Sequence, residues 1–213
     1  DWSDNLSILS GITRDLEGAA EAYQQRLKQR TPPAYDPSKV YLAVEQVESG
    51  DSPMYLYRLQ RQWWDDPVRG AFPINWSQGL VAFDLMPPVM EYFLEIATPN
   101  DYLYGAISGY AYTHPYRDFM SKLDDPEQGW SNYLALTRAT LRRLGWTGLG
   151  LYTNAWRPFD RQLEDATTLR FIEGLPEVDT LVMGMGRDGE PTEAEPNYLL
   201  GADDVFVTHL RTR

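Results

Sequence analysis

The sequence contains no cysteine, and this absence excludes disulfides, thiolate metal sites and a cysteine nucleophile. Positive charge is also in short supply, because 19 Lys and Arg stand against 31 Asp and Glu, which leaves a net charge of −12. Phosphate groups are bound by clustered Lys and Arg, so this balance argues against a nucleic acid or an anionic membrane surface as partner. We expect a neutral or cationic ligand instead.

No apolar run is long enough to cross a bilayer, and no signal peptide is recognisable. The chain begins with Asp1 rather than Met, so we expect a piece of a longer or processed chain that contains further domains. A length of 213 residues suits one domain with a sizeable core, and we predict a single α/β domain over residues 1–213. We expect the protein to be secreted or associated with the cell envelope.

Motifs for phosphate binding and for a serine nucleophile are missing. Gly145–Gly150 (GWTGLG) lacks the Gly-Lys-Ser/Thr ending of a phosphate loop, and Gly184–Gly186 lacks the third glycine of a dinucleotide fingerprint. No serine stands in a Gly-x-Ser-x-Gly elbow. We therefore expect no cofactor.

Aromatic residues are plentiful, with seven Trp, fourteen Tyr and seven Phe. They indicate either a large core or exposed platforms for sugar rings, since amphipathic aromatic side chains serve both purposes. Composition alone leaves both interpretations open.

Short apolar stretches alternate with stretches of helical periodicity through most of the chain. We expect strands at residues 39–46, 71–76, 102–108, 148–153, 180–185 and 205–210, and helices at 16–27, 54–64, 85–97, 131–144 and 165–173. Alternation of this kind predicts βα units with a mainly parallel sheet. Six strands are fewer than the eight of a full barrel. The predicted fold class is α/β, with an incomplete or distorted TIM-like barrel as first choice and an open parallel sheet as second.

Parallel α/β folds bind ligands at the loops that follow the carboxyl ends of their strands, so the strand list becomes a list of candidate site residues. We expect the substrate to be bound by residues after the second, third, fourth and sixth strands, namely Asn75, Trp76, Ser108, Gly109, Tyr110, Tyr112, His114, Asn154, Trp156 and His209.

Acidic residues in the same loops are the candidates for catalysis. Glycoside hydrolysis needs two carboxyl groups, one to protonate the leaving oxygen and one to attack or to activate water. Asp51 and Glu48 share the loop after the first strand, and Asp188 and Asp160 are possible partners from other loops. A solvated loop charge is the other interpretation of each residue, and the sequence leaves both open.

His114 and His209 are the two histidines of the chain, and both fall on the predicted binding edge. A metal site would need a further ligand such as Asp51, and residues this far apart in the sequence do not favour one. We therefore expect no metal. A neutral histidine both donates and accepts hydrogen bonds, which suits a sugar hydroxyl.

The stretch Ser108–Pro115 reads SGYAYTHP and follows the third predicted strand directly. Here the sequence resembles the GxGYxYP putative glycoside hydrolase family, and specifically its C-terminal domain. Further similar segments occur in the same order over roughly residues 5–155, at Asn5–Ser7, Lys39–Ser52, Pro73–Ser77, Pro87–Met90, Thr98–Asp101 and Tyr102–Tyr112.

The chain departs from the family pattern at two places. Ile107 stands where the first glycine of the motif belongs, and Thr113 and His114 separate Tyr112 from the following proline. Family members tend to carry Asp-Gly-Asp-Asn after the first strand, where this chain has Ser49–Ser52 (SGDS). Ser49 stands where the family has its first Asp, so any role of that Asp would be lost in this chain. Glu48 is the nearest carboxylate, one position before Ser49.

The resemblance implies a carbohydrate-active domain. We predict a glycoside hydrolase-like protein that binds a carbohydrate and uses paired carboxylates at the carboxyl ends of the strands. The alternative is a non-catalytic carbohydrate-binding or interaction module derived from such an enzyme.

Overall fold

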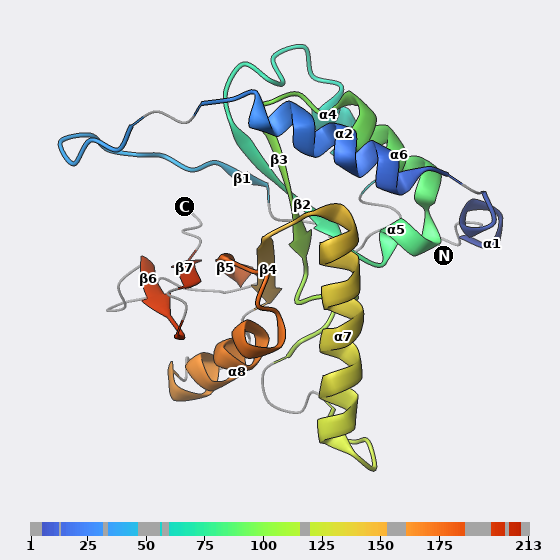
Figure 1. The fold of residues 1–213 in the computed structure, drawn as a ribbon, viewed down its shortest axis with the longest axis vertical. Helices are drawn as coiled ribbons and strands as arrows, with labels where there is room; N and C mark the ends of the chain where they lie inside the picture. Colours follow the sequence, from blue (N-terminus) through green and yellow to red (C-terminus); the bar gives the residue numbers. More distant parts are fainter. Residues whose placement is uncertain are drawn as a thin grey trace. The chain divides into compact units, whose positions relative to one another are not determined.

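The computed structural model describes residues 6–12, 14–31, 34–46, 56, 60–115, 120–152, 161–185, 197–202 and 205–209, with the backbone alone at 6, 161–165, 184–185, 197–198 and 209. The helices of this part of the chain are α1 (Leu6–Ser10), α2 (Leu16–Lys28), α4 (Arg61–Trp64), α5 (Ala82–Leu85), α6 (Pro87–Ile96), α7 (Pro126–Leu144) and α8 (Arg161–Gly174) (Figure 1). The strands are β1 (Glu45–Gln46), β2 (Ile74–Gly79), β3 (Asp101–Ala106), β4 (Gly148–Tyr152), β5 (Thr180–Met185), β6 (Asn197–Leu200) and β7 (Val205–His209).

These strands form one sheet in the order β1-β2-β3-β4-β5-β7-β6. β1 pairs with β2, β3 with β4, β4 with β5 and β5 with β7 in parallel, whereas β6 is antiparallel to β7. A doubly wound sheet reverses its strand order at a switch point, whereas each crossover of a βα barrel moves to the next strand in the same direction. The first five strands lie in chain order, as in an incomplete barrel. The predicted α/β fold with a mainly parallel sheet is confirmed.

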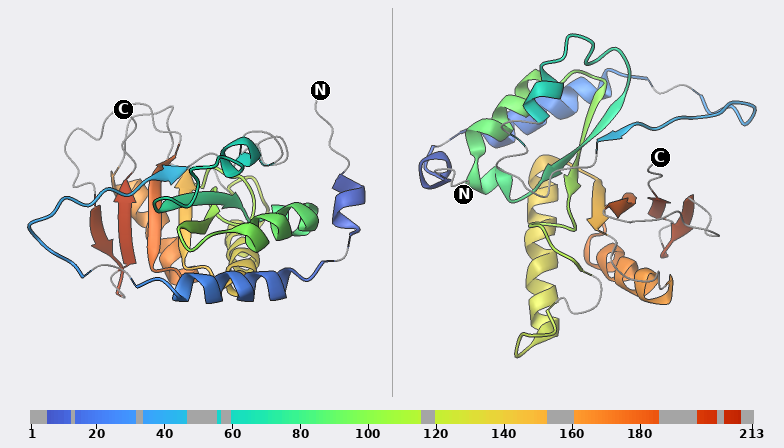
Figure 2. Two further views of the ribbon diagram at one scale, coloured as in Figure 1. Left: turned by 90° about the horizontal axis from the view of Figure 1, so that it is seen from above. Right: turned by 180° about the vertical axis from the view of Figure 1, so that it is seen from behind.

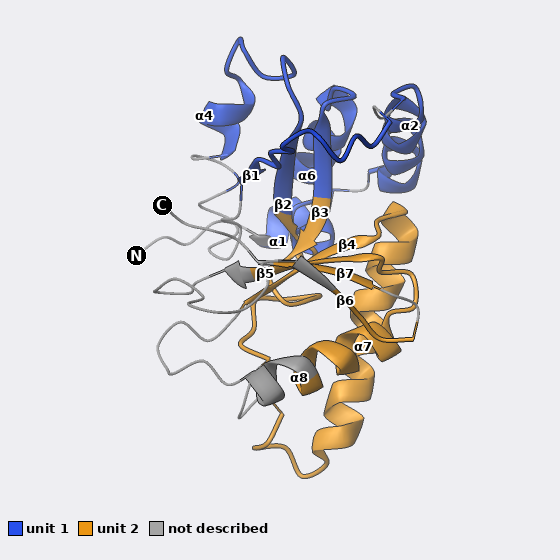
Figure 3. Ribbon diagram, turned by 90° about the vertical axis from the view of Figure 1, so that its left-hand side faces the viewer, with its two compact units in different colours: residues 1–77, 82–103 blue, residues 78–81, 104–213 orange. Residues whose placement is uncertain are grey.

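The chain divides into two compact units, and the boundary between them passes through β2 and β3 (Figure 3). Unit 1 comprises residues 1–77 and 82–103, and unit 2 comprises residues 78–81 and 104–213. Each unit is described by itself below. The single-domain assignment from the sequence stays a prediction.

In unit 1, α2 and α6 lie side by side (Figure 1, Figure 2). Asp15 caps α2 by accepting a 2.9 Å hydrogen bond from the Gly18 N–H. The buried Tyr23 hydroxyl donates to the Asp101 carbonyl at 3.0 Å and accepts from the Leu103 N–H at 2.7 Å. These bonds tie the middle of α2 to the start of β3.

In unit 2, α7 is bounded by clear sequence signals. Asp125 accepts a hydrogen bond from the Gln128 N–H at 2.9 Å, and Pro126 occupies the first turn, where a missing N–H costs little. Gly145 ends the helix in the left-handed conformation with φ of 66°. The helix therefore starts five residues before the predicted Ser131, because Asp125-Pro126 is the true cap.

The predicted buried strand 39–46 is wrong over most of its length. Only Glu45–Gln46 pair with β2, and Val40 and Leu42 are 98% and 88% exposed. Val40 and Leu42 precede β1 and belong to no described strand, so their apolar side chains are not packed in a layer of the described sheet.

The second strand lies three residues later than predicted, at Ile74–Gly79 instead of 71–76. Pro73 has no N–H for the ladder, and the strand begins directly after it. Asn75 and Trp76 consequently lie in the first half of β2 and not at its carboxyl end. The antiparallel strand β6 was not predicted at all.

The other predicted strands and helices agree with the structure to within a few residues, except that only α4 of the expected helix 54–64 is described. Pro87 and Pro88 stand in the first turn of α6, as expected. Among the described residues, none of the helices is long and apolar enough to cross a membrane.

Candidate functional site

The carboxyl ends of β3, β4, β5 and β7 lie at one edge of the sheet in unit 2. The parallel register pairs Gly105 with Leu149 and Tyr152 with Met185, and it places the backbone of His209 beside Met183. The loop 107–115 follows β3 at this edge, next to the end of β4. The register thus gathers a set of strand ends of the kind at which parallel α/β proteins bind ligands.

Ser108 anchors the start of this loop to β4. Its N–H donates to the Gly150 carbonyl at 2.6 Å, and its hydroxyl accepts from the Tyr152 N–H at 2.8 Å. The side chain is fully buried, and φ of 63° lies in the left-handed region. Ser108 therefore continues the sheet hydrogen bonding while it turns the chain out of the strand.

Two residues of α7 hold the next part of the loop. The Tyr133 hydroxyl lies 2.6 Å from the Ala111 carbonyl, 3.1 Å from the Ser108 carbonyl and 3.2 Å from the Ala111 N–H. The Thr137 hydroxyl accepts from the Tyr110 N–H at 3.0 Å and donates to the Tyr133 carbonyl at 2.9 Å. Burial raises the pKa of Tyr133, so its proton remains available for these bonds.

Gly109 is required at its position for two reasons. Its φ of 117° is a conformation that side chains disfavour, and an added Cβ would come within 2.8 Å of the Thr137 hydroxyl and of the Tyr133 ring. The close approach of loop and helix therefore depends on a residue without a side chain.

The loop and the end of β4 together present three rings, which we call the aromatic cluster: Tyr112, His114 and Tyr152. The ring centroids of Tyr112 and His114 are 5.5 Å apart, those of Tyr112 and Tyr152 are 5.7 Å apart, and those of His114 and Tyr152 are 4.3 Å apart. Tyr112 is 45% exposed, His114 is exposed and Tyr152 is half-buried. Such a group offers apolar ring surface together with hydroxyl and imidazole groups for hydrogen bonding.

The structure brings five of the predicted substrate-binding residues to this place. Tyr112 and His114 are in the aromatic cluster. Tyr110, two residues before Tyr112, is half-buried, and Ser108 and Gly109 are buried at the start of the loop. Tyr152, Tyr133 and Thr137 were not predicted. Tyr152 ends the apolar strand GLGLY, and the spacing of Tyr133 and Thr137 by one helical turn was the available signal for the other two.

Asn75 and Trp76 take other positions, both in unit 1. The Asn75 amide donates to Glu45 Oε1 at 2.8 Å and to the Val44 carbonyl at 3.3 Å. Trp76 is buried, and its indole N–H donates to Asp101 Oδ1 at 3.0 Å. A sugar platform needs an exposed ring face, and the Trp76 ring is 3% exposed because it packs on Trp64.

The remaining predicted residues lie outside the described part of the chain. They are the catalytic candidates Asp51, Glu48 and Asp188, their possible partner Asp160, and the substrate-binding candidates Asn154 and Trp156. His209 is described by its backbone only. Within the described residues, no three His, Asp or Glu side chains are grouped so as to hold a metal ion.

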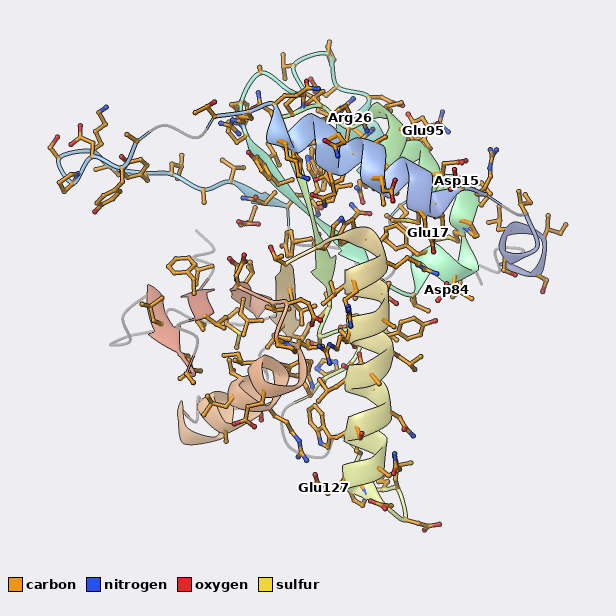
Figure 4. All side chains as sticks on the ribbon, viewed as in Figure 1. Asp15, Glu17, Arg26, Asp84, Glu95 and Glu127 are labelled. Carbon is orange, nitrogen blue, oxygen red and sulfur yellow. The ribbon has the colours of Figure 1, made fainter. Side chains whose placement is uncertain are left out.

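A separate hollow of about 430 Å³ in unit 1 is lined by residues of α2, its cap and α6. Figure 4 shows Asp15 and Arg26 at opposite ends of α2 and Glu95 on the neighbouring α6. Three of its four charged side chains have structural roles: Asp15 caps α2, Glu91 pairs with Arg14 at 2.8 Å, and Arg26 Nε donates to the Ala97 carbonyl at 3.1 Å. We assign no ligand to it.

Comparisons with known proteins agree with this fold. Residues 38–202 match the model of the "GxGYxYP putative glycoside hydrolase C-terminal domain", so the match extends well past residue 155, where the similar segments end. A solved structure described as "a putative hydrolase from Bacteroides thetaiotaomicron VPI-5482" has a similar fold, with a TM-score of 0.68 and 19% identity over 97% of this chain. This chain spans 36% of that protein's length. Comparison with curated proteins finds no match.

The family model covers most of the chain, including β2, β3, the loop 107–115 and β4. The chain therefore belongs to the GxGYxYP putative glycoside hydrolase family.

Proposed function

We propose that this domain binds a glycan at the aromatic cluster and hydrolyses a glycosidic bond. The observation that carries the proposal is that the exposed Tyr112 and His114 contact the half-buried Tyr152 at the carboxyl edge of the sheet. Sugar rings pack their C–H faces on aromatic rings, while their hydroxyls need donors and acceptors at the rim. The cluster offers both kinds of contact within one group of touching side chains.

The rigid support of the cluster favours a binding role over a core role. Ser108, Tyr133 and Thr137 hold the loop backbone by hydrogen bonds from two different elements. A binding loop whose backbone is already held by hydrogen bonds loses little conformational entropy when a ligand binds. Tyr112 and His114 are exposed, so part of their ring surface is accessible to a ligand.

The hydrolytic step would use carboxylates from the loops after the strands. One carboxylic acid protonates the glycosidic oxygen, and a second carboxylate attacks the sugar carbon or activates water. Asp51 and Glu48 are the candidates after β1, and Asp188 is the candidate after β5, with Asp160 as a further partner. Membership of a glycoside hydrolase family supports this chemistry.

A screen over a broad glycan panel tests the proposal, with binding and release of reducing ends measured on the same samples. Wild type is compared with Tyr112→Ala, His114→Ala and Asp51→Asn. Binding that is lost in the first two variants, with turnover lost and binding kept in Asp51→Asn, is the expected result. Turnover by Asp51→Asn at the wild-type rate would remove Asp51 from the mechanism.

Two other outcomes are informative. Binding without turnover by wild type would favour the non-catalytic carbohydrate-binding module. Wild-type affinity of Tyr112→Ala and His114→Ala for every bound glycan would overturn the assignment of the site to the aromatic cluster. The exposed Tyr35, which lies far from Tyr112 in the sequence and in unit 1, provides the matched control as Tyr35→Ala.

A further inference from the structure

A second hollow in unit 1 has the composition of a ligand site. Its volume is about 280 Å³, close to the lower end of small-molecule pockets at about 300 Å³. The wall is mostly apolar, and three polar side chains stand in it. The lining residues are Arg30, Leu42, Ala43, Val44, Pro73, Asn75 and Tyr102.

Arg30 is the cation of this hollow. Its Nη1 donates to the Tyr102 hydroxyl at 3.0 Å, and its guanidinium carbon lies 5.6 Å from the centre of the Tyr102 ring. Within the described part of the chain, Arg30 has no carboxylate partner, although acidic residues far outnumber basic ones. A guanidinium has five N–H donors, so most of them are left for another acceptor. Tyr102 therefore orients a cation that forms no ion pair with a carboxylate of the described residues.

Asn75 supplies a fixed amide beside this cation. Its nitrogen donates to Val44 and to Glu45, which leaves its carbonyl oxygen to accept from a ligand hydroxyl. Glu45, the acceptor of that hydrogen bond, is not among the residues that line the hollow. Leu42, Val44 and Pro73 add apolar surface of the kind that the C–H face of a sugar ring can cover.

We propose that this hollow binds the carboxylate-bearing ring of an acidic sugar. The Arg30 guanidinium pairs with the sugar carboxylate through two parallel N–H···O bonds, and Asn75 accepts from a ring hydroxyl. The inference rests on the proposed glycan function and names a substrate class for it. It differs from the neutral or cationic ligand expected from the net charge, since a nearby guanidinium acts on a bound carboxylate more strongly than distant carboxylates, whose effect salt screens.

Isothermal titration with oligomers of galacturonate, glucuronate and mannuronate tests the inference, each beside its uncharged methyl ester. At least one acid is expected to bind wild type about ten-fold or more tightly than its ester, as a hydrogen bond to a charged group implies. Arg30→Gln should abolish this preference. Arg30→Lys should keep part of it, because charge remains while the two-bond geometry is lost.

Lys28→Gln is the matched control, because it removes the same charge from the exposed last residue of α2, two positions before Arg30. It should leave the acid preference unchanged. Equal affinity of wild type for every acid and its ester, or an unchanged preference in Arg30→Gln, overturns the inference. Tyr112→Ala separates the two proposals, since it should weaken neutral glycans at the aromatic cluster. If wild type binds no neutral glycan, the result counts against the proposed function. If wild type binds neutral glycans but shows no preference for acids over their esters, the result counts against the acidic-sugar site in the hollow.

Discussion

The Tyr133 hydroxyl of α7 lies 2.6 Å from the carbonyl oxygen of Ala111, in the middle of the loop that carries Tyr112 and His114. One phenol thus contacts the loop backbone on both sides of Tyr110, at Ser108 and at Ala111. The position of the aromatic cluster therefore depends on a helix residue that itself contributes no ring to the cluster.

Tyr133→Phe should loosen this loop. The change removes the hydroxyl and leaves Ala111 N–H and C=O without that partner, at a cost of about 1–3 kcal/mol in the free energy of unfolding. Urea unfolding gives the stability, and hydrogen exchange at Tyr110–Tyr112 should rise locally. Asn132 offers a control, because Asn132→Ala changes an exposed neighbour of Tyr133 whose side chain, within the described residues, accepts a hydrogen bond only from the exposed Gln128. Unchanged exchange in Tyr133→Phe would contradict the anchoring role.

Gly109→Ala should destabilise unit 2 and weaken glycan binding together. A backbone φ of 117° and contacts of 2.8 Å to Thr137 and Tyr133 both oppose a Cβ. Strain of this type costs of order 1–3 kcal/mol. Gly11→Ala is the control, since a Cβ there meets its nearest atoms at 3.4 Å and 3.5 Å. A Gly109→Ala protein with wild-type stability would show that the loop can move away from α7 at no cost.

Asp101 is expected to be the most sensitive carboxylate of unit 1. It is fully buried and accepts from Arg69 at 2.5 Å, from the Trp76 indole at 3.0 Å and from the Thr98 N–H at 2.8 Å. Asp101→Asn leaves the Arg69 charge without its partner, so the free energy of unfolding should fall by roughly 3–5 kcal/mol.

The exposed pair of Arg61 and Asp65 is the control for this prediction. Its atoms are 3.4 Å apart, and both side chains are at least half exposed. Arg61→Gln should change stability by less than about 1 kcal/mol. If Asp101→Asn and Arg61→Gln lower the free energy of unfolding equally in chemical denaturation, the buried Asp101–Arg69 pair contributes no more to stability than the exposed pair, and the prediction is wrong.

Tyr23 should make stability depend on alkaline pH. Burial raises the pKa of its phenol above the ordinary value of about 10. The unfolded chain then loses the proton first as pH rises, so this contribution is complete below pH about 10 and is lost as pH climbs towards the folded pKa. The slope for one group reaches about 1.4 kcal/mol per pH unit.

Urea unfolding at several alkaline pH values, for wild type and Tyr23→Phe, measures this effect. The variant loses the bonds to Asp101 and Leu103, so it is less stable at neutral pH, and its stability should fall less steeply above pH about 10. Parallel pH profiles for the two proteins would contradict a buried, protonated Tyr23.

The sequence by itself determined the elements that have strong local signals. The capped, periodic segments at α2 and α7 and the short apolar strands β3, β4, β5 and β7 could be read without any knowledge of their neighbours. Their alternation was enough to predict the α/β class, and the positions of the strands were enough to place Tyr112 and His114 in the loop after the carboxyl end of β3.

Only the tertiary structure decided which apolar residues are buried and which polar groups hold the site. Val40 and Leu42 look like core residues in sequence, yet they are exposed and lie before β1, whose described pairing covers only Glu45 and Gln46. Trp76 looks like a sugar platform, yet it is buried because β2 starts later, after Pro73. The burial of a side chain depends on which elements pack on its face of the sheet. The contacts of Tyr133 with Ala111 and of Arg30 with Tyr102 join residues distant in the sequence, so local sequence patterns do not predict them.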